Sequence, residues 1–164
     1  MRDEKNSFRQ DLQDFSGFTG LNGQNSISEK GEGTIMTDDE LTRLIIGCAM
    51  KVHRTLGSGF LESVYQNALA FELKKAGINF ACEVPLKVYY EGEVMGTFVV
   101  DMLAENHVII ENKAVENLCP AHEAQLVNYL AATHNDFGLL FNFGTSSLQF
   151  KKKFRIYRAP ESQL

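Results

Sequence analysis

Three charged residues interrupt two apolar stretches in the segment VVDMLAENHVIIENKAVE, residues 99–116. Asp101 lies among valine, methionine and leucine, whereas Glu111 and Lys113 follow a run of valine and isoleucine. Charges within buried strands are costly unless something compensates them. A divalent cation held by two carboxylates would do so, and Mg²⁺ prefers oxygen ligands of this kind. Such a group could carry out metal-assisted hydrolysis, with the lysine orienting or deprotonating the attacking water.

A β-hairpin would bring these residues together. Strands are predicted at about 94–103 and 108–115, with ENH as the turn. If the turn is centred on Asn106, antiparallel partners have numbers that sum to about 212, which pairs Asp101 with Glu111. Side chains alternate along a strand, so Lys113 lies on the same face as Glu111. An ordinary ion pair of the lysine with a carboxylate, on a half-exposed sheet, explains the same spacing.

The other elements follow from apolar periodicity and turn residues. Thr37 and Glu40 form a capping-box pattern at the start of a helix that LGSG, residues 56–59, interrupts. Further helices are predicted at about 60–76 and 120–133. Strands are predicted at about 80–90, 138–143 and 148–157. The predicted order is therefore α-α-β-β-β-α-β-β.

Length and composition indicate one domain with a real core, since 44% of the 164 residues are hydrophobic. Residues 1–36, rich in Gly, Ser and Asn, are predicted to be a disordered N-terminal extension. They precede a domain at 37–158 and a C-terminal tail at 159–164. No apolar run is long enough to span a bilayer. Three dispersed cysteines without a secretion signal predict reduced thiols and a cytoplasmic protein.

Several motifs together resemble a known family. The pattern D-(nine residues)-E-x-K, from Asp101 to Lys113, resembles the signature of the PD-(D/E)XK nuclease superfamily. GFLESVY, residues 59–65, has the form G-x-x-E-x-x-Y and opens a helix ahead of the sheet. AHEAQLVNYL, residues 121–130, has Q-x-x-x-Y on the helix after the E-x-K strand. With GLLFNFG at 138–144, the chain resembles the GxxExxY family of that superfamily over about residues 38–158.

The resemblance implies an α/β, restriction-endonuclease-like core, in which a mixed sheet carries the charged hairpin in its middle and helices on both faces. It also implies that Asp101, Glu111 and Glu62 hold Mg²⁺ or Mn²⁺, and that Lys113 positions or activates water. The implied activity is metal-dependent hydrolysis of phosphodiester bonds in DNA. The family's pattern has a proline before the aspartate, whereas this sequence has Val100.

Four more polar residues bear on this site. Gln125 matches a residue that helps to orient the lysine or the substrate phosphate, and Tyr129 follows one helical turn later. Glu83, on the first predicted strand, is expected to face solvent, although a contact with the site is an alternative. His122 is expected to have a structural role, although a phosphate contact is an alternative.

Charge is distributed unevenly. The net charge is −5, yet five of the eight residues in KKKFRIYR, residues 151–158, are basic. We expect Lys151, Lys152, Lys153 and Arg155 to bind nucleic-acid phosphates, although lysines also protect solvated edge strands. The overall acidity keeps a rival open, a non-catalytic nucleic-acid-binding or assembly module with the same fold. A metal-dependent hydrolase of smaller phosphorylated substrates is a third hypothesis. A homo-oligomer or partner protein would supply the missing positive surface.

Overall fold

The computed structural model describes residues 36–156, so the predicted tail and almost all of the predicted extension lie outside the described residues. The chain divides into two units, Met1–Thr42 and Arg43–Leu164, and the sheet belongs to the second. The elements are α2 (Asp38–Leu56), α3 (Glu62–Lys75), β1 (Phe80–Tyr90), β2 (Glu93–Ala104), β3 (Val108–Lys113), α4 (Pro120–Thr133), β4 (Phe137–Asn142) and β5 (Gln149–Phe154). The predicted order of helices and strands is confirmed. No helix in the described range is long and apolar enough to cross a membrane.

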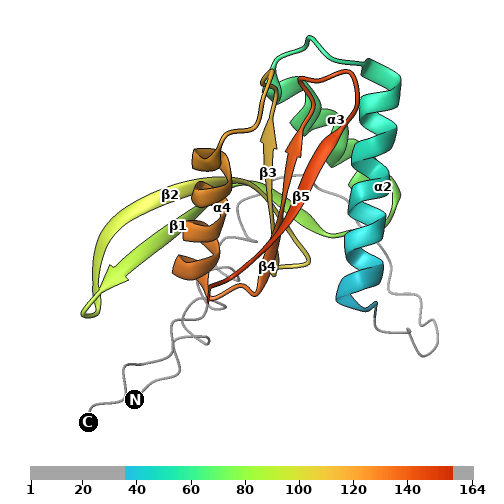
Figure 1. Ribbon diagram of the computed structural model, residues 1–164. Coiled ribbons are helices and arrows are strands. Elements are labelled where there is room, and N and C mark those ends of the chain that lie inside the picture. The colour runs from blue at the N-terminus through green and yellow to red at the C-terminus, as the bar shows by residue number, and fades with distance from the viewer. Residues whose placement is uncertain (1–35, 157–164) are drawn as a thin grey trace, which may run out of the picture. The chain divides into compact units, whose positions relative to one another are not determined.

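The five strands form one mixed sheet in the order β1-β2-β3-β4-β5 (Figure 1). β3 and β4 run parallel, and all other neighbouring strands are antiparallel. α4 connects the two parallel strands, because a parallel pair needs a long crossover connection. β3 is therefore the central strand, and the charged β2–β3 hairpin lies in the middle of the sheet as predicted. The pairs Met102–Ile110 and Leu103–Ile109 confirm the predicted register, with partner numbers that sum to 212.

Helices pack on both faces of the sheet. A Cβ atom built on Gly138 of β4 would lie 2.8 Å from a methyl group of Leu126 and 3.4 Å from one of Leu130, so α4 packs tightly on this face. Phe141 of β4 points to the opposite face and contacts Phe143. Phe143 in turn stacks on Tyr65 of α3, with ring centroids 4.7 Å apart. The apolar core is thus formed on both sides of β4.

The predicted capping box at the start of α2 is confirmed. The backbone N–H and the hydroxyl of Thr37 donate to the Glu40 carboxylate at 2.8 and 2.9 Å, and the Glu40 N–H donates back to Thr37 Oγ1 at 3.3 Å. The helix ends where Gly57 takes a φ of +69° and donates its N–H to the His53 carbonyl. Glycine is favoured there because other residues rarely adopt a positive φ.

The third strand is shorter than predicted. We expected it to extend to Val115, but β3 ends at Lys113 because the Asn142 side chain replaces a neighbouring strand there. Asn142 Oδ1 accepts the Val115 N–H at 3.0 Å, and Asn142 Nδ2 donates to the Val115 carbonyl at 2.9 Å. A Cβ atom on Gly144 would lie 2.4 Å from that carbonyl oxygen, so this close backbone approach requires glycine. The predicted bounds of β1 and α4 and the predicted start of β3 are confirmed, and the remaining ends differ from the predicted ones by at most three residues.

Candidate active site

The two predicted carboxylates meet where the β2–β3 ladder ends. Beyond the Met102–Ile110 pair, side chains replace the backbone ladder. Asp101 Oδ2 accepts the backbone N–H of Asn112 at 2.7 Å, and the Asp101 N–H donates to Glu111 Oε1 at 3.4 Å. The structure therefore brings Asp101 and Glu111 together, in the register that the turn predicts.

Glu111 is almost fully buried, with 2% of its side chain exposed. Burial, and then the charge of Asp101, raise the pKa of Glu111 to about 7. Lys113 opposes this rise in pKa, but its Nζ is 3.6 Å from Glu111 Oε2, longer than a good hydrogen bond. Burial also raises the pKa of Asp101, against the favourable Asn112 N–H. The positive charge of Lys113 therefore does not balance the negative charges of both carboxylates.

Glu62 faces the same cluster from α3. It is the first residue of this helix, which begins after Gly59 takes a φ of +112°. Tyr65 anchors this turn by donating its hydroxyl to the Gly57 carbonyl at 2.7 Å. Burial raises the pKa of Glu62, whereas the charge of Lys113 lowers it and that of Asp101 raises it. The glycine and the tyrosine of G-x-x-E-x-x-Y thus shape the turn and position the glutamate.

Glu83 is an acidic neighbour of the site with a backbone conformation that the sequence did not predict. The pairs Cys82–Met102 and Val84–Val100 place Glu83 opposite Asp101, yet Glu83 leaves the ladder with a φ of +53°. A positive φ is uncommon for a residue other than glycine. Its side chain is exposed, as expected, and its charge contributes to raising the pKa of Asp101. Glu83 therefore adds negative charge at the edge of the site.

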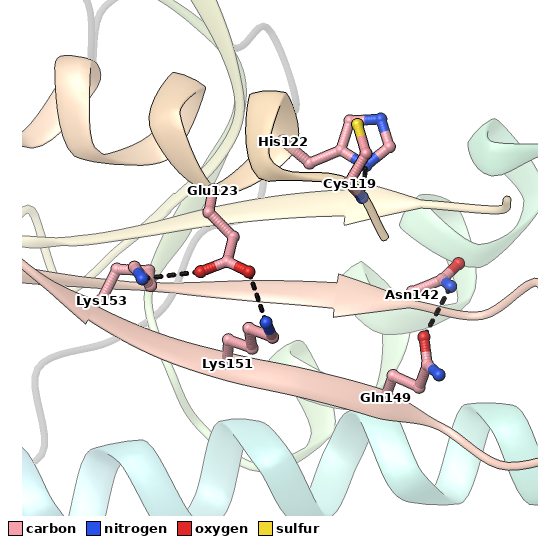
Figure 2. Close-up of polar contacts among 7 residues, drawn as sticks. All are labelled: Cys119, His122, Glu123, Asn142, Gln149, Lys151 and Lys153. Atoms are coloured by element: carbon pink, nitrogen blue, oxygen red, sulfur yellow. Dashed lines mark hydrogen bonds and ion pairs between the residues drawn. The ribbon is translucent and has the colours of Figure 1, made fainter. Parts of the chain in front are cut away.

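The predicted residues of α4 divide into two groups. Gln125 Nε2 donates to the Tyr129 hydroxyl at 2.7 Å, and the Tyr129 ring packs against Phe98 of β2, with centroids 5.1 Å apart. This bond joins the two residues of Q-x-x-x-Y to each other. His122 instead caps the helix, because its Nδ1 accepts the Cys119 N–H at 3.2 Å (Figure 2). His122 therefore has the structural role that we expected.

Asn142 is a site-shaping residue that the sequence analysis missed. Its side chain is fully buried, and besides Val115 it bonds the Gly144 N–H at 3.1 Å and Gln149 Oε1 at 3.0 Å (Figure 2). The β3–β4 register places it beside Lys113. The available signal was a polar residue within the apolar run GLLFNF, since buried polar groups are normally hydrogen-bonded.

The three lysines of β5, and Arg155 directly after it, lie in different surroundings. Lys151 and Lys153 both pair with Glu123 of α4 (Figure 2). The ammonium of Lys152 lies 4.3 Å from the centroid of the Phe137 ring. Arg155 pairs with Asp136 at 2.9 Å. The structure thus divides the predicted phosphate-binding residues into separate groups.

A divalent cation fits the chemistry of the carboxylate pair. Asp101 is half-buried, Glu111 is buried, and both acids have raised pKa values, so a cation between them would remove their mutual repulsion and favour their charged forms. Glu62 would be the third ligand of such an ion. Across residues 36–156, however, no three side chains of His, Cys, Asp or Glu are already arranged to hold a metal.

A comparison with protein-family models identifies the family of the chain. A protein-family model described as the PD-(D/E)XK nuclease superfamily matches residues 39–155. Among solved structures, SSO0001 is 16% identical, with 92% of this chain and 77% of that chain covered and a TM-score of 0.47. An alkaline exonuclease from Laribacter hongkongensis is 11% identical, with 75% and 73% covered and a TM-score of 0.43. No curated protein matches. Nucleases of the PD-(D/E)XK superfamily generally use divalent metals. Because the family model matches most of the length of this chain, the chain belongs to the PD-(D/E)XK nuclease superfamily.

Proposed function

We propose that the protein is a metal-dependent nuclease of the GxxExxY family, which hydrolyses phosphodiester bonds in DNA. The observation that carries the proposal is the pair of half-buried Asp101 and buried Glu111, with one lysine beside Glu111 among the described residues. Two carboxylates that have lost water and lack sufficient counter-charge are the ligands that a divalent cation would stabilise. Membership of the nuclease superfamily supports the same chemistry.

Each side chain then has a role. Asp101, Glu111 and Glu62 hold Mg²⁺ or Mn²⁺, which when bound supplies charge stabilisation at the phosphoryl group and acidifies water. Asn112 fixes the Asp101 carboxylate through its backbone N–H. Lys113, 3.6 Å from Glu111 and 14% exposed, orients the attacking water or accepts its proton. Gln125 and Tyr129 act together, since they hydrogen-bond each other.

The test is cleavage of single- and double-stranded DNA and RNA with Mg²⁺, Mn²⁺ or EDTA. We expect wild type to cleave DNA only with metal, and Lys113→Ala to be slower by about 10²- to 10⁴-fold, the usual contribution of a proton-transfer or orienting group. Lys51→Ala is the matched control, since Lys51 pairs with Glu72 on the surface. Wild type that cleaves nothing, or Lys113→Ala that cleaves as fast, would refute the proposal.

A binding measurement distinguishes the rival, a non-catalytic module with the nuclease fold. Calorimetry with Mn²⁺ should give a heat of binding for wild type that Asp101→Asn removes. Absence of any Mn²⁺ binding that depends on Asp101, together with intact DNA binding, would favour the module.

A further inference from the structure

Two lysines of β5 share one carboxylate of α4. Lys153 Nζ is 2.7 Å from Glu123 Oε2, and Lys151 Nζ contacts the other oxygen, Oε1 (Figure 2). The side chains stay accessible to solvent, with 48% of Lys151, 30% of Lys153 and 24% of Glu123 exposed. The cluster therefore carries one excess positive charge where a soluble anion can reach it.

Strand register relates this cluster to the acidic site. Lys151 pairs with Leu140, and Leu140 pairs with Glu111, so all three lie on the same face of the sheet. Neighbouring strands are about 4.8 Å apart, which places Lys151 roughly 10 Å from Glu111 along this row. A nucleic-acid backbone bound at the acidic site would therefore pass close to the two lysines.

We propose that Lys151 and Lys153 bind a backbone phosphate of the nucleic-acid substrate, and that Glu123 occupies their site as an internal competitor until the phosphate displaces it. This inference rests on the proposed function, because the phosphate belongs to the substrate. A carboxylate and a phosphodiester both present two oxygens that share one negative charge, so each can accept from both ammonium groups. Lys152 and Arg155 are not part of the site, because their charged groups lie against Phe137 and Asp136.

Protonation of Glu123 does not break its ion pairs with the two lysines near neutral pH. Hydrogen bonds from Lys151, then from Lys153, lower the pKa of Glu123 to about 2. Glu123 therefore stays charged around neutral pH, and only another anion can take its place. Substrate binding and release of Glu123 are then one exchange.

The first experiment measures binding of a fluorescein-labelled single-stranded DNA oligonucleotide to the full chain by anisotropy, in EDTA and low salt. We expect Glu123→Gln to bind about three- to tenfold more tightly, the range that exposed ion pairs would account for. Glu72→Gln is the matched control: it removes the same charge, from a glutamate 2.7 Å from Lys51 and 3.8 Å from Lys75. It should leave the affinity nearly unchanged.

The second experiment adds Lys151→Ala with Lys153→Ala, in the wild-type and the Glu123→Gln backgrounds. The pair of substitutions should cost more affinity in the Glu123→Gln background, where both lysines are available. It should also reduce the slope of log affinity against log salt by about one for each lysine. Thermal unfolding of every variant shows whether α4 and β5 still fold.

Two results would overturn the inference. One is Glu123→Gln that binds DNA no more tightly than wild type or Glu72→Gln. The other is an affinity gain that survives the loss of both lysines. Since EDTA suppresses metal-dependent cleavage, the outcome is separate from that of the nuclease assay: a gain in affinity without any cleavage would refute the nuclease and leave the phosphate site intact.

Discussion

Two glutamate–lysine clusters lie on the same face of one sheet and have opposite electrostatics. Glu111 lies beside Lys113 and has a pKa raised to about 7, whereas Glu123 lies between Lys151 and Lys153 and has a pKa lowered to about 2. Both consist of the same two residue types. The difference comes from burial and from the number of cations in contact.

Among the described residues, Glu111 loses water and gains one lysine, whose Nζ is 3.6 Å away, so its charged form is unfavourable. Glu123 keeps its access to water and touches two ammonium groups, so its charged form is favourable. The cluster around Glu111 therefore has an excess of negative charge, whereas the cluster around Glu123 has one excess positive charge. This contrast supports the two proposals, that the first cluster holds metal and the second holds phosphate.

The largest stability effect is expected at Glu111. Its folded pKa of about 7 exceeds the ordinary value of 4.5, so its stabilising contribution is complete below about pH 4.5 and is lost as the pH rises through 7. In EDTA at about pH 8, Glu111→Gln should be more stable than wild type by about 3 kcal/mol, because an amide does not ionise. Denaturant unfolding at about pH 8 and about pH 4 measures this difference, which should nearly vanish at the lower pH, below the unfolded-state pKa.

The control for that variant is Glu72→Gln. The hydrogen bond from Lys51 lowers the pKa of Glu72, so this substitution should give no gain at high pH. Added Mg²⁺ should stabilise wild type more than Glu111→Gln. A Glu111→Gln variant that is less stable than wild type at about pH 8 would contradict the account of the buried cluster.

A smaller effect, this time a loss of stability, is expected at Asn142, which lies between the two clusters as the strand partner of Lys113 and Gln149. Asn142→Ala leaves the backbone of Val115 without its partners and should lower the free energy of unfolding by about 2 kcal/mol. Urea unfolding measures the loss. The DNA affinity gained by Glu123→Gln should persist in this background if the two clusters are independent.

Asn112 provides the matched comparison for Asn142. Within the described part of the chain, its buried amide has no hydrogen-bond partner. Replacing a buried polar group that makes no bonds removes a desolvation cost, so Asn112→Leu should be neutral or stabilising. Equal losses at Asn112 and Asn142 would show that burial, rather than hydrogen bonding, sets the cost.

The smallest effect is expected at Glu123. Its folded pKa lies below the ordinary 4.5, so its stabilising contribution is present above that value and is lost as the pH falls toward 2. Glu123→Gln should lower Tm slightly near neutral pH, and the difference from wild type should shrink as the solution is acidified. Exposed ion pairs contribute little, which is why the expected change is small. A large loss of Tm would indicate that the cluster mainly fastens α4 to β5.

Much of the fold was predictable because its signals are local. The alternation of apolar residues and the ENH turn set the β2–β3 register, which brings Asp101 to Glu111. The capping box of Thr37 and Glu40 followed from a spacing of three residues. Glu62 required a family motif, because a glutamate at the start of a helix is common and no local pattern distinguishes one that faces a site.

The remaining features depend on residues far apart in the chain. The left-handed backbone of Glu83 has no local signal, and the hydrogen bonds of Asn142 to Val115 join β4 to the end of β3. From the sequence, the basic residues of the last strand are phosphate-binding residues or the lysines of a solvated edge strand, and nothing local separates one lysine from another. Glu123, about thirty residues earlier, pairs with Lys151 and Lys153.

The sequence by itself determined which charges enter the sheet, the order of the elements and the register of the central hairpin. It did so because strand alternation and turn length act over a few residues. Only the tertiary structure decided the electrostatic character of each cluster. A pKa depends on how much water the packed helices exclude and on which cations the strands bring within reach, and both are set by contacts between distant parts of the chain.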